Sequence, residues 1–198
     1  MKLNIGGQKG YKTLAKNGVK DWTIVDVRKG ADIIHDVHEG PMPIGDESVD
    51  AIYTSHTFEH IFPDKLTDVL KDCRRVLKPG GKIRIVVPNI ERAIRAYVKG
   101  DSNYLKDKNN PTKPDFYPND PIYYLMSWFM TYSLDKDLGR RLVGGHVNVF
   151  NPPSLRGWLS RANFKGLKQM EFNENSPEFK GCDFPRYKNC SIYMEATK

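Results

Sequence analysis

The fold is decided by one stretch, Asp46 to Ile90, which reads DESVDAIYTSHTFEHIFPDKLTDVLKDCRRVLKPGGKIRIVVPNI. An apolar run from Val49 to Tyr53 predicts a buried strand, because continuous short apolar runs are typical of strands covered on both faces. A polar cluster, Thr54-Ser55-His56, ends this strand. Apolar residues at helical spacing then predict a helix from about Asp64 to Leu77.

Pro79-Gly80-Gly81 breaks the helical pattern, and Lys82 to Pro88 predicts a second strand. Strand, helix and strand in this order form one βαβ unit of a parallel sheet. Ligands of such sheets bind at the carboxyl ends of the strands, which is where Thr54, Ser55 and His56 fall. The stretch therefore predicts both a fold class and the edge of the sheet that carries a site.

The same stretch resembles class I (Rossmann-like) S-adenosylmethionine-dependent methyltransferases, in which a strand ending in SH..EH precedes a helix ending in R-x-L-K-P-G-G. The matching residues are Ser55, His56, Glu59, His60, Arg75, Leu77, Lys78, Pro79, Gly80 and Gly81. The resemblance runs from Leu3 to the last predicted strand. It is closest to small members that look like glycan-pathway methyltransferases, whose first motif LNLGCG corresponds to LNIGGQ at residues 3–8.

The pattern along the rest of the chain predicts an α/β fold, a doubly wound, mostly parallel seven-stranded sheet with an antiparallel edge strand and a small aromatic-rich helical cap. Further strands are expected at Lys2–Ile5, Trp22–Val27, Ala31–Val37, Phe164–Phe172 and Cys190–Thr197. Helices are expected at Tyr11–Asn17, Glu91–Val98, Pro121–Ser133 and Pro153–Ala162, with a proline-rich loop from Asp101 to Asp120.

A length of 198 residues suits a single domain, 1–198, with residues 101–146 as a cap or acceptor-binding insertion. No apolar window is long enough for a membrane span, and the N-terminal residues lack a signal-peptide pattern, so a cytoplasmic location is expected. Three cysteines without metal-ligand spacing are expected to be free thiols. The net charge of +7 is spread along the chain, which favours a solvated basic surface over a nucleic-acid site.

A cofactor site is predicted from the glycines that follow the first strand, since Gly6, Gly7 and Gly10 would let the backbone approach a nucleotide closely. Gln8 and Tyr11 occupy the second and third glycine positions of the dinucleotide pattern G-x-G-x-x-G, which argues against a nicotinamide enzyme. Gln8 also departs from the methyltransferase motif, which has a second glycine there.

Two acidic residues end the next strands. Asp26, followed by Val27, is expected to accept hydrogen bonds from the ribose hydroxyls of an adenosine ligand; the alternative is an Asp that caps a turn. The resemblance implies that Asp36 faces the adenine amine and that the backbone amide of Val37 faces the ring. Ser55 and His56 complete the expected S-adenosylmethionine site, which is predicted to hold no metal ion.

Methyl transfer to a hydroxyl requires a base, for which His146 and His60 are the candidates, with His56 nearby. Each histidine could instead have a structural role. Eight aromatic residues between Tyr104 and Tyr132 could form a stacking wall for a sugar or the core of the cap, and residues 101–133 a cover over the acceptor. A saccharide or other small-molecule hydroxyl is the favoured acceptor. An RNA-directed methyltransferase and a non-catalytic partner subunit with this fold are the alternatives.

Overall fold

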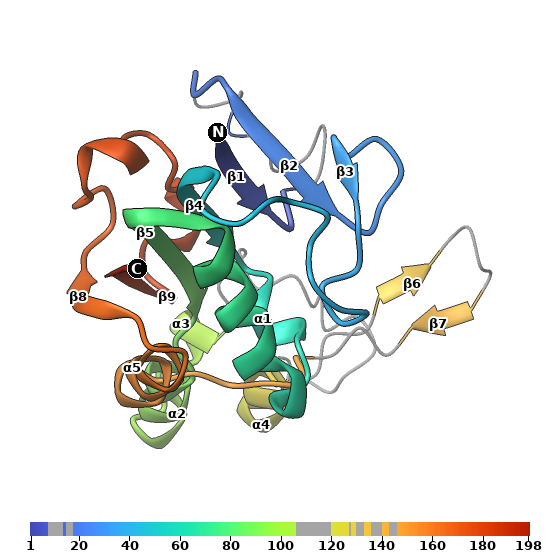
Figure 1. Ribbon diagram of the computed structural model, residues 1–198. Helices are drawn as coiled ribbons and strands as arrows, with labels where there is room; N and C mark the ends of the chain where they lie inside the picture. Colours follow the sequence, from blue (N-terminus) through green and yellow to red (C-terminus); the bar gives the residue numbers. More distant parts are fainter. Residues whose placement is uncertain are drawn as a thin grey trace.

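The computed structural model describes residues 1–7, 14, 18–105, 120–126, 128–129, 133–135, 140–142 and 146–198 (Figure 1). Gln8, Gly10, all of the expected helix at 11–17 except Leu14, and most of the loop at 101–120 lie outside these residues. In the part of the chain that is described, no helix has the length and apolar character needed to cross a membrane.

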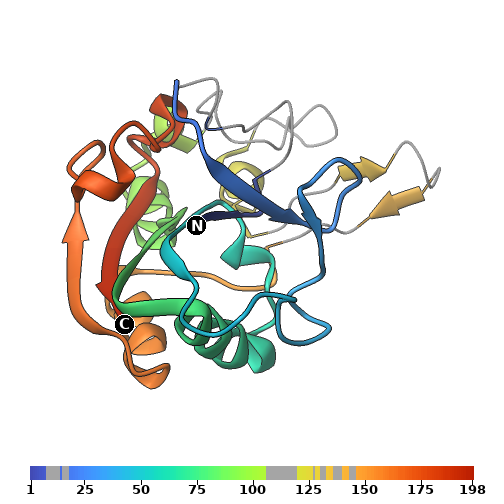
Figure 2. The same cartoon turned by 45° about the horizontal axis from the view of Figure 1, so that its top comes forward.

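Seven strands form one sheet with the order β3-β2-β1-β4-β5-β9-β8 (Figures 1 and 2). The strands are β1 (Lys2–Ile5), β2 (Trp22–Asp26), β3 (Ile33–Ile34), β4 (Val49–Ser55), β5 (Leu77–Pro88), β8 (Lys165–Met170) and β9 (Ser191–Thr197). Neighbours among β1 to β5 are parallel, and β9 runs antiparallel to both β5 and β8. The mostly parallel seven-stranded sheet is confirmed, with β9 as its antiparallel strand next to the edge.

Two strands differ most from their expected bounds. β5 begins at Leu77 rather than Lys82, because Leu77 already pairs with Val49 before a register shift brings Lys82 opposite Ala51. β3 is reduced to two residues of the expected seven.

The helix expected from Pro121 to Ser133 is wrong at its end. Helix α4 covers Pro121–Met126, and Ser133 instead begins a strand, β6 (Ser133–Asp135). This strand pairs antiparallel with β7 (Arg140–Leu142), with Ser133 opposite Leu142. Residues in a helix cannot form hydrogen bonds to a neighbouring strand, so the pairing of β6 with β7 excludes a helix at Ser133 despite the local helical pattern.

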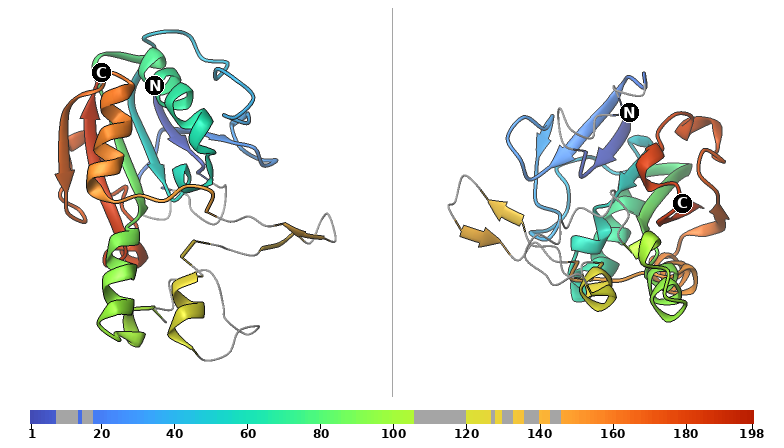
Figure 3. Two further views of the ribbon diagram at one scale, coloured as in Figure 1. Left: turned by 90° about the horizontal axis from the view of Figure 1, so that it is seen from below. Right: turned by 180° about the vertical axis from the view of Figure 1, so that it is seen from behind.

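One face of the sheet is covered by α1 (Pro63–Val76) and α5 (Pro152–Arg161), which lie side by side (Figure 3). Proline occupies the first turn of each helix, where no intrahelical donor is lost. Leu66 of α1 and Leu155 of α5 pack in the same buried cluster as Ile83 and Ile85 of β5. The opposite face packs against Leu14 and the segment 171–190, through Phe179 and Cys182.

The other helices lie together beyond the carboxyl end of β5 (Figure 3). They are α2 (Ile90–Val98), α3 (Ser102–Leu105) and α4. Trp128 is 6% exposed and stacks on Tyr104, with ring centroids 5.6 Å apart. These two aromatics therefore belong to a small core of the cap rather than to an open stacking wall.

A buried ion cluster fastens the segment 171–190 to the sheet. Arg84 of β5 is fully buried, and its guanidinium donates to both oxygens of Asp183, at 2.9 and 2.6 Å. It also donates to Glu195 Oε1 of β9 at 2.8 Å. A buried arginine is stable only while such partners compensate its charge.

Replacing Asp183 with Asn should therefore lower the free energy of unfolding by about 1.5–3 kcal/mol, because it removes the charge of one of the two carboxylates that pair with buried Arg84 and leaves only Glu195. Asp46→Asn is the matched control, since the Asp46 side chain is 72% exposed although it pairs with Arg75 at 2.6 Å. The control should change stability by about 0–1 kcal/mol. Urea unfolding of both variants checks this, and equal losses would contradict a structural role for the buried cluster.

Candidate functional site

The sheet changes direction between β1 and β4. From β1 the chain moves outward through β2 and β3, then returns to place β4 and β5 on the other side of β1. Ligands in open α/β sheets bind at such a switch point, outside the carboxyl ends of the strands. Here the two strands are followed by Gly6 and His56, so these residues mark the expected site.

A cavity of about 540 Å³ opens at this point. Of the predicted site residues it is lined by Gly6, Asp26, Val27, Asp36, Val37, His56 and His60. Its other lining residues were not predicted: Ile5, Val25, Arg28, His35, His38, Thr57 and Ile61. A smaller hollow of about 270 Å³ adjoins it at Val37 and His38 and extends towards α1. The larger cavity is the candidate site, because it brings the carboxyl ends of four parallel strands together.

The glycine turn after β1 is held in close contact with Thr57. Gly6 has a φ of +72°, and a Cβ at this position would lie 2.0 Å from Thr57 Oγ1. Gly7 is buried, and a Cβ there would lie 2.1 Å from Asn4 Nδ2. Both positions therefore require glycine for the backbone to pass so close to its neighbours.

Asp26 caps a turn with one carboxylate oxygen and leaves the other without a partner among the described residues. Its Oδ1 accepts a hydrogen bond from the Arg28 amide at 3.0 Å, which caps the turn. Its Oδ2 is buried and has no hydrogen-bond partner among the described residues. A buried acceptor without a donor is costly, so this oxygen at the cavity wall is suited to ligand hydroxyls.

Asp36 is already paired within its own turn. Its Oδ1 accepts from the His38 amide at 2.9 Å and lies 2.8 Å from His38 Nδ1. Burial acts to raise the pKa of Asp36, but the two His38 contacts outweigh it and the pKa is lowered. One oxygen of Asp36 thus caps a turn, as Asp26 does, and the residue also lines the cavity.

His56 is fixed from several sides. It has a φ of +51°, which is uncommon for a residue with a side chain, and its amide donates to the Val86 carbonyl at 2.8 Å. Its ring stacks on Tyr187 at a centroid separation of 3.6 Å, and Nε2 lies 2.8 Å from Ser191 Oγ. Ser55, the preceding residue, is 5% exposed and does not line the cavity.

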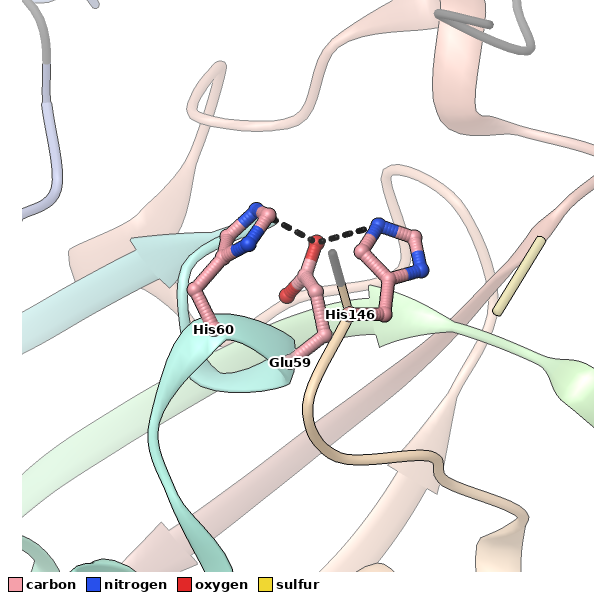
Figure 4. A group of neighbouring side chains, drawn as sticks. All are labelled: Glu59, His60 and His146. Atoms are coloured by element: carbon pink, nitrogen blue, oxygen red, sulfur yellow. Dashed lines mark ion pairs between the residues drawn. The ribbon is translucent and has the colours of Figure 1, made fainter. Parts of the chain in front are cut away.

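Glu59 is the centre of a histidine cluster beside the cavity (Figure 4). The residue is 1% exposed, and its Oε1 lies 3.3 Å from His56 Nδ1. The same oxygen lies 4.0 Å from His60 Nε2 and 4.0 Å from His146 Nε2. Burial acts to raise the pKa of Glu59, but the contact with His56 and the charges of the three imidazoles hold it at about 2. The carboxylate is therefore ionised.

His146 reaches this cluster from the far end of the cap. The Asn148 amide donates to the Glu59 carbonyl at 3.0 Å, which ties the segment after His146 to the turn Phe58–His60. The Nδ1 atom of His146 lies 2.6 Å from the Trp128 carbonyl oxygen. The structure thus brings both predicted catalytic histidines together, and adds Glu59, which the sequence motif contains but for which no role was predicted.

Residues 6–85 match the model of a family described as "Methyltransferase domain". No curated protein matches the sequence significantly. Among solved structures, an S-adenosylmethionine-dependent methyltransferase from Archaeoglobus fulgidus is 17% identical, with a TM-score of 0.57 over 100% of this chain and 85% of that one. A possible histamine N-methyltransferase from Thermotoga maritima is 15% identical, with a TM-score of 0.55 over 100% and 81% of the two chains.

A third similar structure is the Burkholderia thailandensis 1,6-didemethyltoxoflavin-N1-methyltransferase with bound 1,6-didemethyltoxoflavin and S-adenosylhomocysteine. It is 15% identical, with a TM-score of 0.53 over 100% of this chain and 70% of that one. At these identities the likeness is one of fold. The chain therefore has the fold of S-adenosylmethionine-dependent methyltransferases, and the family match spans its glycine turn, both strand-end acids and the histidine cluster up to His60.

The close contact between Gly6 and Thr57 can be tested with two glycine variants. Gly18 has a φ of +75°, but a Cβ added there would meet no atom of the described residues within 4 Å, so Gly18→Ala measures mainly backbone strain. We expect it to cost roughly 1 kcal/mol, and Gly6→Ala to add roughly 1–3 kcal/mol of overpacking. Urea unfolding gives both values; equal costs would show that Thr57 does not constrain the glycine turn.

Proposed function

We propose that this protein binds S-adenosylmethionine and transfers its methyl group to a hydroxyl of a saccharide or another small metabolite. The observation that carries the cofactor assignment is the buried Oδ2 of Asp26 at the end of β2, which has no partner among the described residues and lies on the wall of the switch-point cavity. The match of residues 6–85 to the methyltransferase family supports the same cofactor and reaction.

In this proposal each residue predicted for the cofactor site contacts one part of the cofactor. Asp26 accepts hydrogen bonds from the ribose hydroxyls, with Val27 beside it, and Asp36 and the Val37 amide contact the adenine. Gly6 and Gly7 of the glycine turn pass close to the amino-acid part of the cofactor, and Gln8 and Gly10, for which the same role is expected, lie outside the described residues. His56 and Ser55, at the end of β4, lie nearest its sulfonium end.

The enzyme's main contribution is to align the acceptor with the methyl group, since the sulfonium already activates the methyl for transfer. A hydroxyl acceptor must also lose its proton. The Trp128 carbonyl can only accept a hydrogen bond, so it fixes the proton of neutral His146 on Nδ1 and leaves Nε2 as an acceptor. A proton acceptor beside the cavity favours a hydroxyl over an amine, because a neutral amine needs no deprotonation before attack.

A small-molecule acceptor is supported by one of the similar structures. The Burkholderia thailandensis protein holds bound 1,6-didemethyltoxoflavin together with S-adenosylhomocysteine. The cavity of about 540 Å³, which lies within the range of pockets for small ligands, is assigned to the cofactor. The segment 101–146 is proposed to contribute the rest of the acceptor pocket, because its His146 reaches Glu59.

Asp26→Asn tests the cofactor assignment. The variant keeps the oxygen that caps Arg28 but replaces the acceptor Oδ2 by an amide that cannot accept from ribose hydroxyls. S-adenosylmethionine affinity, measured by calorimetry, should fall by roughly 1–3 kcal/mol. Asp32→Asn is the control beside β3: Asp32 accepts from the Ile24 amide at 2.8 Å and does not line the cavity. If Asp26→Asn binds S-adenosylmethionine as tightly as the unchanged protein, Asp26 does not bind the ribose.

His146→Ala tests the role of the histidine cluster in the reaction. Turnover of an acceptor found by screening should fall ~10²- to 10⁴-fold, because a group that removes the proton acts only in the transition state. Calorimetric affinity for S-adenosylmethionine should survive. His60→Ala is measured in the same assay. If His60→Ala loses most of its turnover while His146→Ala keeps near-normal turnover, the proton acceptor is His60. If both variants keep full turnover, alignment alone carries the reaction.

A further inference from the structure

The buried carboxylate of Glu59 has no hydrogen-bond partner among the described residues. No described residue donates a well-directed hydrogen bond to either carboxylate oxygen, and the nearest nitrogen is His56 Nδ1, 3.3 Å from Oε1. Buried carboxylates are normally hydrogen-bonded or paired, because desolvation of the charge is costly. Both buried oxygens of Glu59, however, lack such a hydrogen-bond donor among the described residues.

His146 presents a second acceptor atom to the Glu59 carboxylate. Its Nδ1 carries the ring proton, since it faces the Trp128 carbonyl at 2.6 Å. The Nε2 atom of the neutral ring then carries a lone pair, and it faces Glu59 Oε1 across 4.0 Å. That separation is too long for a direct hydrogen bond, so a proton on Nε2 would not bridge the two atoms well. A cation held between them would.

The separations suit one metal ion held by three donors. One ligand atom each of Glu59, His60 and His146 lie within 4.8 Å of one another. Nitrogen and oxygen donors bind zinc at ~2.0 to 2.2 Å in a tetrahedral arrangement, which places two donors of one ion ~3.3 to 3.6 Å apart. Binding one ion therefore requires the side chains of His60 and His146 to approach Glu59 by roughly 1 Å.

The surroundings also resemble those of metal ligands in proteins. A ligating histidine usually donates its other ring nitrogen to a carbonyl, as His146 does to Trp128. Ligating carboxylates are usually oriented by a neighbouring polar group, and His56 is placed to do this, because Tyr187 and Ser191 fix its ring. Two histidines with one carboxylate leave coordination positions open, as in catalytic zinc and non-haem iron sites.

We infer that Glu59, His60 and His146 form a binding site for one divalent transition-metal ion of the zinc type. Since His60 also lines the cofactor cavity, an open coordination position would face the acceptor. The sequence alone predicts no metal site, because His146 lies far from the other two ligands along the chain and follows no recognisable ligand spacing.

The catalytic consequence rests on the proposed function. With its Nε2 bound to the ion, His146 would not act as the base; the ion would instead lower the pKa of an acceptor hydroxyl bound to it, and the proton would pass to solvent water. The oxygen then attacks the methyl carbon. The new O–C bond forms while the S–C bond breaks, and the electron pair of that bond returns to sulfur.

The test is metal binding by the full chain, without cofactor or acceptor. Chelator-treated protein, freed of chelator and of any affinity tag, is titrated with Zn²⁺ by calorimetry and with Co²⁺ by visible absorption. We expect one ion per chain and a cobalt spectrum typical of nitrogen and oxygen ligands in low coordination. The three cysteines are buried, so they do not compete for the ion.

Glu59→Gln and His146→Ala should each lower Zn²⁺ affinity by ~100-fold or more, since loss of an outer partner alone costs ~10- to 100-fold. His35→Ala is the matched control: this histidine lines the same cavity but its Nε2 lies 3.1 Å from the Gly40 carbonyl. It should bind zinc as the unchanged protein does. Circular dichroism confirms that each variant is folded.

Two results would overturn the inference. One is that the unchanged protein does not bind one zinc ion per chain, and the other is that the Glu59 and His146 variants bind zinc as tightly as the unchanged protein. The cluster would then be a carboxylate–imidazolium pair. Calorimetry with S-adenosylmethionine on metal-free protein separates this failure from that of the proposed function. Cofactor binding without any metal site leaves methyl transfer standing, whereas a metal site without cofactor binding supports the inference and removes the proposed reaction.

Discussion

The parallel pairing of β4 with β1 on one side and β5 on the other is the constraint on which the rest of the structure depends. Ile5 lies opposite Thr54, so the chain leaves β1 at Gly6 next to the point where it leaves β4 at His56. Val49, Ile52 and Tyr53 are fully buried, which fixes the register of β4 through both of its faces. The cavity exists because two strands distant in the chain end together.

Much of this arrangement could be predicted from local sequence. The strand Val49–Tyr53, the helix near Asp64–Leu77 and the proline-glycine break are each set by neighbours a few residues apart, and the structure confirms the strand and the helix within a few residues. The strand-end position of Asp26 follows from the same reasoning. These features depend on burial pattern and turn chemistry, which a single sequence records.

The remainder depends on contacts between residues far apart in the chain. The approach of His146 to Glu59 is set by the Asn148–Glu59 hydrogen bond and the Trp128 carbonyl, neither of which leaves a local pattern. The helix expected at Pro121–Ser133 is wrong at Ser133 for a similar reason, because strand pairing with Leu142 overrides local preference. Gln8 and Gly10 lie outside the described residues, so the roles expected for them stay predictions.

The stack of Tyr187 on His56 has a consequence for how this sequence can change over time. Tyr187 belongs to the segment 171–190, which Arg84 and Asp183 anchor to the sheet and which supports the cavity wall through this ring. Without this contact the segment could vary in length and composition, as surface loops usually do. Insertions or deletions that shift Tyr187 would therefore also shift the His56 ring that it supports. Selection that preserves the cavity thus also acts on the segment 171–190, although this segment contributes no residue to the cavity lining.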